Sequence, residues 1–190
     1  MIKNILVVIL LFCFLYNASA QKTDAVSKWK FHSVNQVGLL QGESKSAFHL
    51  QSVNGLEKKN WFAGIGVGID YYRYKSIPLF AEGIKYFGKT RNQFFIYADA
   101  GVNFIWEKTN KSTFYSEKYS PGFYWGSGIG YKAGLKNGTG FLISAAYSYK
   151  RVNDQQTQEE ICPFAGPCNI QTDNYRYNLN RLLLQIGWMF

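Results

Sequence analysis

The chain has 190 residues, a formal net charge of +9, and 18 Gly, 14 Tyr, 15 Phe and 5 Trp against only 4 Pro. Its length suits one domain rather than several. The positive side chains are dispersed and form no basic helix, which argues against nucleic acid as a partner and favours an anionic membrane surface. The aromatic and glycine content, without helical periodicity, indicates a β-protein.

Residues 1–20 have the three parts of a secretory signal peptide. A lysine precedes an apolar run, and an A-x-A cleavage motif follows at 18–20. The apolar run is shorter than the about 20 residues that a membrane-spanning helix needs. We therefore expect residues 1–20 to be removed and residues 21–190 to form one exported domain.

Eight segments of the exported domain alternate between apolar and small or polar residues, as β-strands do, and Gly, Asn, Ser, Lys or Pro clusters separate them. Most are longer than the usual globular strand and suit a tilted strand that crosses a membrane, which needs about 9 to 11 residues. The expected strands are 28–41, 46–54, 60–74, 77–87, 92–106, 120–134, 139–151 and 175–190.

The two faces of these strands differ in a way that indicates which one meets lipid. In segment 92–106 one face carries Phe94, Ile96, Ala98, Ala100, Val102, Phe104 and Trp106, and the other carries Phe95, Tyr97, Asp99, Gly101 and Asn103. A soluble barrel needs an outer face of Lys, Glu and Thr, whereas the polar face here is rich in glycine with isolated charges. The pattern favours an all-β, eight-stranded antiparallel transmembrane barrel. A soluble lipocalin-like barrel is the alternative.

The isolated charges of the second face predict a polar network inside the barrel. Its expected members are Asp70, Asp99, Lys132, Lys150 and Arg181. Segment 77–87 does not fit this assignment of a lipid face and an inner face, because Glu82 lies on the same face as Phe80, Ile84 and Tyr86. Either a bulge or the opposite register would turn Glu82 away from lipid, and the sequence leaves the choice open.

The connections predict which end of the barrel faces the cell exterior. Short turns are expected near 55–59, 88–91 and 135–138, and outer loops at 42–45, 75–76, 107–119 and 152–174. An even number of strands places both termini on one side, and outer-membrane barrels have short turns on the periplasmic side. We therefore expect periplasmic N- and C-termini and two long loops outside.

Two cysteines, Cys162 and Cys168, lie in the longest expected loop as CPFAGPC. Pro and Gly residues between the two cysteines can bend the chain so that they meet. In an exported chain, this pattern predicts a local disulfide that staples the loop. Metal binding is the weaker interpretation because no third or fourth ligand is near in sequence.

The whole mature chain resembles small eight-stranded outer-membrane β-barrels of the OmpA and OmpX type, and most of all the barrel-domain proteins of Bacteroidetes-type bacteria. The resemblance rests on WFAGIGVGIDYY, IPLFAEGIKYF and the terminal LQIGWMF. It implies that Phe190, Trp188, Ile186 and Leu184 form the C-terminal signal read by the barrel assembly machinery.

Sequence reasoning favours a non-enzymatic outer-membrane protein with a structural or surface-interaction role. The expected partners are outer-membrane lipid or lipopolysaccharide and an extracellular partner of the two long loops; no catalytic residue, metal or cofactor is predicted. A lipid-modifying enzyme is the alternative, since His49 could meet a serine at the outer rim, whereas His32 lies at a different height. A narrow channel is a further alternative, although eight strands leave room inside only for side chains.

Overall fold

A computed structural model describes residues 29–43, 45–88, 90–107, 111–112, 115–135, 138–159 and 170–190. Nearly all of them are strand. The strands are β1 (Lys30–Gln41), β2 (Ser46–Lys58), β3 (Trp61–Asp70), β4 (Ser76–Phe87), β5 (Gln93–Ile105), β6 (Lys111–Ser112), β7 (Tyr115–Ser120), β8 (Gly122–Gly134), β9 (Gly140–Glu159) and β10 (Ile170–Met189). Within these residues, no helix is long and apolar enough to span a membrane.

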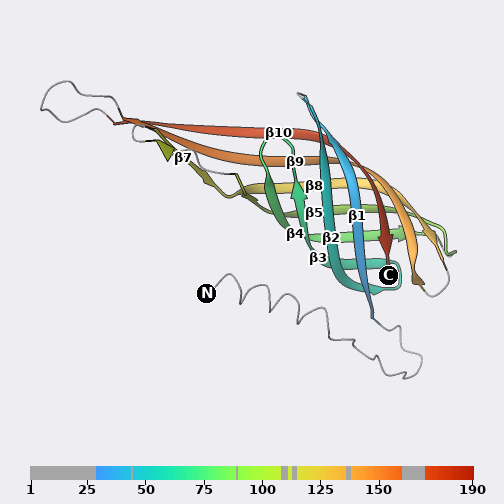
Figure 1. Cartoon of the computed structure of the whole chain (residues 1–190). Helices are drawn as coiled ribbons and strands as arrows, with labels where there is room; N and C mark the ends of the chain where they lie inside the picture. The colour runs from blue at the N-terminus through green and yellow to red at the C-terminus, as the bar shows by residue number, and fades with distance from the viewer. Residues whose placement is uncertain are drawn as a thin grey trace, which may run out of the picture.

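Eight of the strands close into an antiparallel barrel. The order β1-β2-β3-β4-β5-β8-β9 follows the chain, and β10 pairs with both β9 and β1 to complete the circle. Backbone bonds in both directions between Ser33 and Phe190 continue the closing seam to the last residue. The predicted fold class is confirmed (Figure 1).

The strands are staggered around the barrel. Following paired residues from Leu182 on β10 through the seven other strands leads to Phe31 on β1. The direct partner of Leu182 on β1 is Gln41, which lies ten residues from Phe31. Such a stagger tilts every strand relative to the barrel axis, so β9 and β10 leave the barrel at a slant (Figure 1).

Much of the two segments predicted as loops, 107–119 and 152–174, is β-strand in the structure. β9 and β10 are each 20 residues long and continue together beyond the barrel, to Glu159 and from Ile170. β7 pairs with the extended part of β9, and β6 pairs with β7. What the sequence indicated as two loops is therefore largely a β-sheet that projects from one end of the barrel (Figure 1).

We call this extension the projecting sheet and define it as residues 115–120, 153–158 and 171–176. A bulge joins it to the barrel wall. From Ser120 to Tyr124 the chain advances four residues while β9 advances three, from Asn153 back to Lys150. Pro121, which cannot donate to a strand ladder, lies inside this interval, as is usual for proline in sheets.

β4 has the register that the sequence left open. Phe80, Glu82, Ile84 and Tyr86 are all buried inside the barrel, and the alternate residues of β4 face outward. Tyr124 of β8 likewise points inward and is buried. No bulge is needed, because the outward face keeps Leu79 and Phe87.

Glycines on the inner face make room for these aromatic rings. Gly66 on β3 pairs with Phe80 on β4, and Gly130 on β8 pairs with Phe95 on β5. A methyl group at either glycine would overlap the neighbouring ring. Rings that fold over cross-strand glycines fill the barrel without widening it, and they explain why the inner face alternates glycine with large side chains.

Candidate functional site

The interior of the barrel carries a buried ion cluster near the end from which the sheet projects. We call that the loop end, and the opposite end, with Phe190 and the β2–β3, β4–β5 and β8–β9 connections, the turn end. Arg181 donates to Asp70 Oδ2, and Lys150 Nζ lies 3.0 Å from the same oxygen. All three side chains are almost fully buried. The structure thus brings together three of the five residues predicted for the lumen.

Lys150 also ties the connection between β3 and β4 to the barrel wall. Its ammonium group donates to Ser76 Oγ at 2.9 Å and to the backbone carbonyls of Tyr72 and Tyr74 at 3.2 and 3.3 Å. The Tyr72 amide in turn donates to Asp70 Oδ1 at 2.7 Å. One buried cation therefore fixes the position of a connection that closes over the loop end.

Arg181 and His49 complete this level of the interior. Arg181 Nη2 donates to Ser148 Oγ at 2.9 Å, and the guanidinium lies 5.7 Å from the Tyr72 ring centroid. His49 faces Asp70 across the β2–β3 ladder and is 1% exposed, and its Nδ1 has no hydrogen-bond partner among the described residues. His49 is therefore an interior residue of this cluster rather than a residue of the outer rim.

Lys132 lies apart from that cluster, toward the turn end. Its ammonium group is 3.8 Å from Glu57 Oε2 and 4.7 Å from the Tyr86 ring centroid. His32 Nε2 lies 3.7 Å from the same carboxylate oxygen. Glu57 was missed from sequence because it falls in a segment expected to be a turn, whereas β2 continues to Lys58.

Asp99 belongs to a third, separate group. It pairs directly with Glu82 across β4 and β5, and both carboxyl groups are buried. Among the described residues, no Lys, Arg or His forms an ion pair with either one. Two carboxylates side by side in a buried interior would repel each other, so ionising both is unfavourable. The five predicted lumen residues thus lie at three levels rather than in one network.

Removing one charge of the carboxyl pair should stabilise the barrel. We expect Asp99→Asn to raise the free energy of unfolding at neutral pH by about 1–2 kcal/mol, because the repulsion disappears while an acceptor oxygen remains. Urea unfolding in detergent micelles measures this change.

Asn103 supplies the matched control, since it lies four residues along the same inner face of β5 and is fully buried. Asn103→Asp adds a carboxyl group instead of removing one and should lower the unfolding free energy. A loss of stability in Asp99→Asn would show that the Glu82–Asp99 pair is favourable as it stands.

The outer surface of the barrel is a continuous apolar band. Ile65, Ile129 and Leu184, on β3, β8 and β10, are 68%, 65% and 63% exposed. Aromatic side chains flank them toward both ends and are likewise exposed: Trp29, Trp61, Phe94 and Trp188 toward the turn end, and Phe48, Phe104, Trp106 and Phe123 toward the loop end. This distribution is the one that two membrane interfaces select.

The C-terminal residues named as an assembly signal lie in this band. Leu184, Ile186, Trp188 and Phe190 all point outward and are at least half exposed. The Trp188 ring packs against Phe141 of β9, with centroids 5.1 Å apart.

Several sequence predictions fall outside the described residues. The signal peptide, residues 1–20, is one of them, and Cys162 and Cys168 are another. Within the described part of the chain, no group of three or more His, Cys, Asp or Glu side chains is placed to hold a metal ion.

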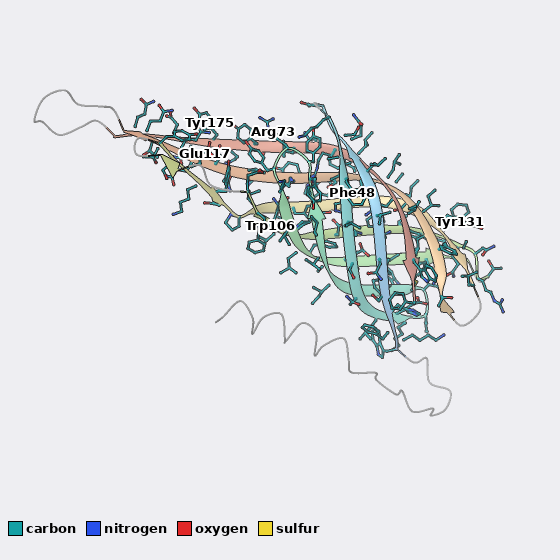
Figure 2. All side chains as sticks on the ribbon, viewed as in Figure 1. Phe48, Arg73, Trp106, Glu117, Tyr131 and Tyr175 are labelled. Atoms are coloured by element: carbon teal, nitrogen blue, oxygen red, sulfur yellow. The ribbon has the colours of Figure 1, made fainter. Side chains whose placement is uncertain are left out.

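The projecting sheet divides its charges between two faces. The face that continues the barrel interior carries Glu117, Asp154 and Asp173, with Tyr115, Tyr119, Tyr175 and three Gln. The opposite face, which continues the lipid-facing surface, carries Lys118 and Arg176 with Ser, Thr, Asn and Gln only. Figure 2 shows Glu117 and Tyr175 on these strands beyond the barrel, and Arg73 near their base.

Comparison with known proteins identifies the fold. No family model matches the chain, and no curated protein matches it. The crystal structure of Neisserial surface protein A (NspA) is similar with a TM-score of 0.56 at 11% identity, over 87% of this chain and 98% of that one.

Two further solved structures give lower scores. The N-terminal β-barrel domain of Pseudomonas aeruginosa OprF has a TM-score of 0.47 at 12% identity, over 86% of this chain and all of that one. The outer membrane protein AlkL in DMPC bilayers has a TM-score of 0.49 at 10% identity, over 92% of this chain and 95% of that one. The likeness to NspA shows that this chain has the fold of a small outer-membrane barrel.

Proposed function

We propose that this chain is an integral bacterial outer-membrane protein, without enzymatic activity, that holds the projecting sheet outside the cell as a surface for interaction. The observation that carries the proposal is the apolar band, which runs over the outward faces of the barrel strands. Each large apolar side chain kept out of water contributes about 1.5–3 kcal/mol. A band of this size is therefore stable in lipid and unstable in water, which argues against a soluble ligand-binding barrel.

The filled interior supports a structural role over that of an open pore. The inner face holds a packed core. Its large side chains Phe62, Tyr86, Tyr124, Lys150 and Arg181 are each at most 2% exposed. Eight-stranded barrels leave just enough space for side chains to fill. Solute passage would have to displace these packed groups.

The placement of His49 argues against the lipid-modifying alternative. A lipid substrate would reach the barrel from the outer surface, whereas His49 points inward and is 1% exposed. The hydroxyl of Ser148, which borders the ion cluster, accepts a hydrogen bond from Arg181. Neither side chain is open to a lipid acyl ester.

The ends of the barrel support an orientation with the turn end and both termini in the periplasm. Connections at the turn end are short, and the projecting sheet rises from the other end, as in outer-membrane barrels. Lys58 and Lys85 lie over the Trp29 and Trp61 rings at the turn end, 4.9 and 4.3 Å from their centroids. Such lysines can reach headgroups while their stems cover apolar surface.

The basic face of the projecting sheet suggests the lipid partner. Lys118 and Arg176 lie on the surface that continues upward from the lipid-facing residues Tyr147 and Tyr149. Cations just above an aromatic girdle are suited to phosphate groups of outer-leaflet lipids such as lipopolysaccharide. During biogenesis, the outward stripe that ends at Phe190 is proposed to be read by the assembly machinery.

Site-specific labelling of intact cells tests the orientation. In a chain whose Cys162 and Cys168 are replaced with Ser, Asn174→Cys places a thiol on the projecting sheet and Arg91→Cys places one at the turn end. We expect a membrane-impermeant maleimide to label Cys at 174 on intact cells, and Cys at 91 only after the outer membrane is opened. The reverse pattern, or labelling of both in a soluble fraction, would contradict the proposal.

A further inference from the structure

The inner face of the projecting sheet combines acidic and aromatic groups without a cation of its own. Its nine residues come from three neighbouring strands, three from each: Tyr115, Glu117, Tyr119, Asp154, Gln156, Gln158, Gln171, Asp173 and Tyr175. The register places Tyr119, Asp154 and Tyr175 side by side in one row, and Glu117, Gln156 and Asp173 in the next. Three carboxylates thus lie among three phenol rings on one surface.

Neutral donors hold these carboxylates in place without cancelling their charge. Gln156 donates to Asp154 Oδ2 at 2.9 Å, and Gln171 donates to Asp173 Oδ2 at 3.2 Å. The Tyr115 hydroxyl donates to Glu117 at 2.6 Å, and this bond raises the pKa of Tyr115 to about 12. The face therefore keeps its negative potential.

Asp154 is incompletely satisfied. Asp154 is 3% exposed and lies between Tyr119 and Tyr175 in their row, and its Oδ1 has no hydrogen-bond partner among the described residues. A buried carboxylate oxygen without a partner costs free energy that a cation seated above it would offset.

At the base of the same face, aromatic rings already contact a cationic side chain of this chain, Arg73. The Arg73 guanidinium lies 4.6 Å from the Tyr177 ring centroid and 5.9 Å from that of Tyr74. These rings continue toward the tip of the sheet, because Tyr74 contacts Tyr119 at 5.6 Å and Tyr177 lies parallel to Tyr175 within 16° at 6.4 Å. Tyr175, the next ring along, is 43% exposed.

We propose that the inner face of the projecting sheet binds the Arg or Lys side chains of a basic, extended polypeptide segment. One cation would lie over the exposed Tyr175 ring beside Asp154 and Asp173, and another beside Glu117. A guanidinium over phenol rings repeats the contact that Arg73 makes with Tyr177 and Tyr74 at the base. The neighbouring carboxylates would add charge-assisted hydrogen bonds. The proposal names the partner class of the surface role proposed above and rests on that role.

Overall charge does not explain such binding. The chain carries a formal net charge of +9 and repels a basic peptide as a whole. Attraction must therefore come from the local acidic face, and it must weaken as salt screens the carboxylates.

The probe is a fluorescent hexa-arginine peptide, titrated by anisotropy against the full mature chain in neutral detergent micelles. We expect binding that falls with added salt and that drops about tenfold or more in the triple variant Glu117→Gln, Asp154→Asn, Asp173→Asn, since three charge contacts are lost. The matched control is Glu43→Gln, which neutralises an exposed carboxylate outside the projecting sheet and should leave the affinity within about twofold.

The aromatic part of the proposal has its own pair of variants. Tyr175→Phe keeps the ring and should retain binding, whereas Tyr175→Ala should weaken it about threefold or more. A boiling-dependent gel shift shows that each variant is folded. If the triple variant bound the peptide as tightly as the parent chain, the proposal would be overturned. It would also be overturned if the chain bound neutral maltohexaose and the amide substitutions did not change that binding, because the face would then be a sugar-binding surface. Because the titration uses purified protein, peptide binding without surface labelling at 174 would count against the orientation alone.

Discussion

Replacing Asp70 with Ala is expected to lower the free energy of unfolding by about 3–5 kcal/mol, the typical cost of removing one partner from a buried ion group. Both Lys150 and Arg181 would then keep their charges inside the barrel without the carboxylate that each contacts. The measurement is urea unfolding in detergent micelles, followed by the heat-dependent gel shift or by tryptophan fluorescence.

The control for Asp70→Ala is Asn174→Ala, which truncates an exposed polar side chain on the projecting sheet and should change stability by less than about 0.5 kcal/mol. A second variant separates charge from packing. Asp70→Asn keeps the size and one acceptor but removes the charge, so it should be nearly as costly as Asp70→Ala. If Asp70→Asn matched the parent chain, the ion cluster would be dispensable and only hydrogen bonding would hold the β3–β4 connection.

Replacing Ile65 with Arg is expected to prevent or strongly impair folding into lipid vesicles. Ile65 is 68% exposed in the middle of β3, and a cation on the lipid face near the bilayer midplane costs about 2–4 kcal/mol. The folded fraction, read from unboiled gels after refolding into vesicles, measures the effect.

Gln155→Arg provides the comparison for Ile65→Arg, because Gln155 lies on the outward face of β9 but above the apolar band. We expect it to fold as well as the parent chain, since Lys118 and Arg176 already occupy this face. Equal folding of both variants would mean that the outward face near Ile65 does not contact lipid.

Hydrophobic alternation was sufficient to predict the barrel strands but not the projecting sheet. In the barrel, one face is apolar and the other is not, so the period of two is visible in segments such as 92–106. In the projecting sheet both faces carry mainly polar residues, as at Glu117 and Lys118. Because neither face is apolar, hydrophobic alternation does not reveal these strands. These residues are therefore predicted as loops from the sequence alone.

Which lumen residues meet one another depended on the stagger of the strands. Asp70 and Arg181 come together because tilted strands bring different heights of the sequence to one level. Asp99 and Lys132 have equally clear inward positions, but the same stagger separates them from that cluster. The sequence shows which way each side chain points, whereas its partner depends on the register around the whole circle.

The central claim is that the apolar band is embedded in the outer membrane, and heat modifiability tests it most directly. Membrane fractions from cells expressing the chain are run on a gel in SDS with and without boiling. We expect the protein in the outer-membrane fraction, with a band that changes mobility on boiling, since a folded barrel resists SDS until heated. Recovery in the soluble fraction with no shift would contradict the account.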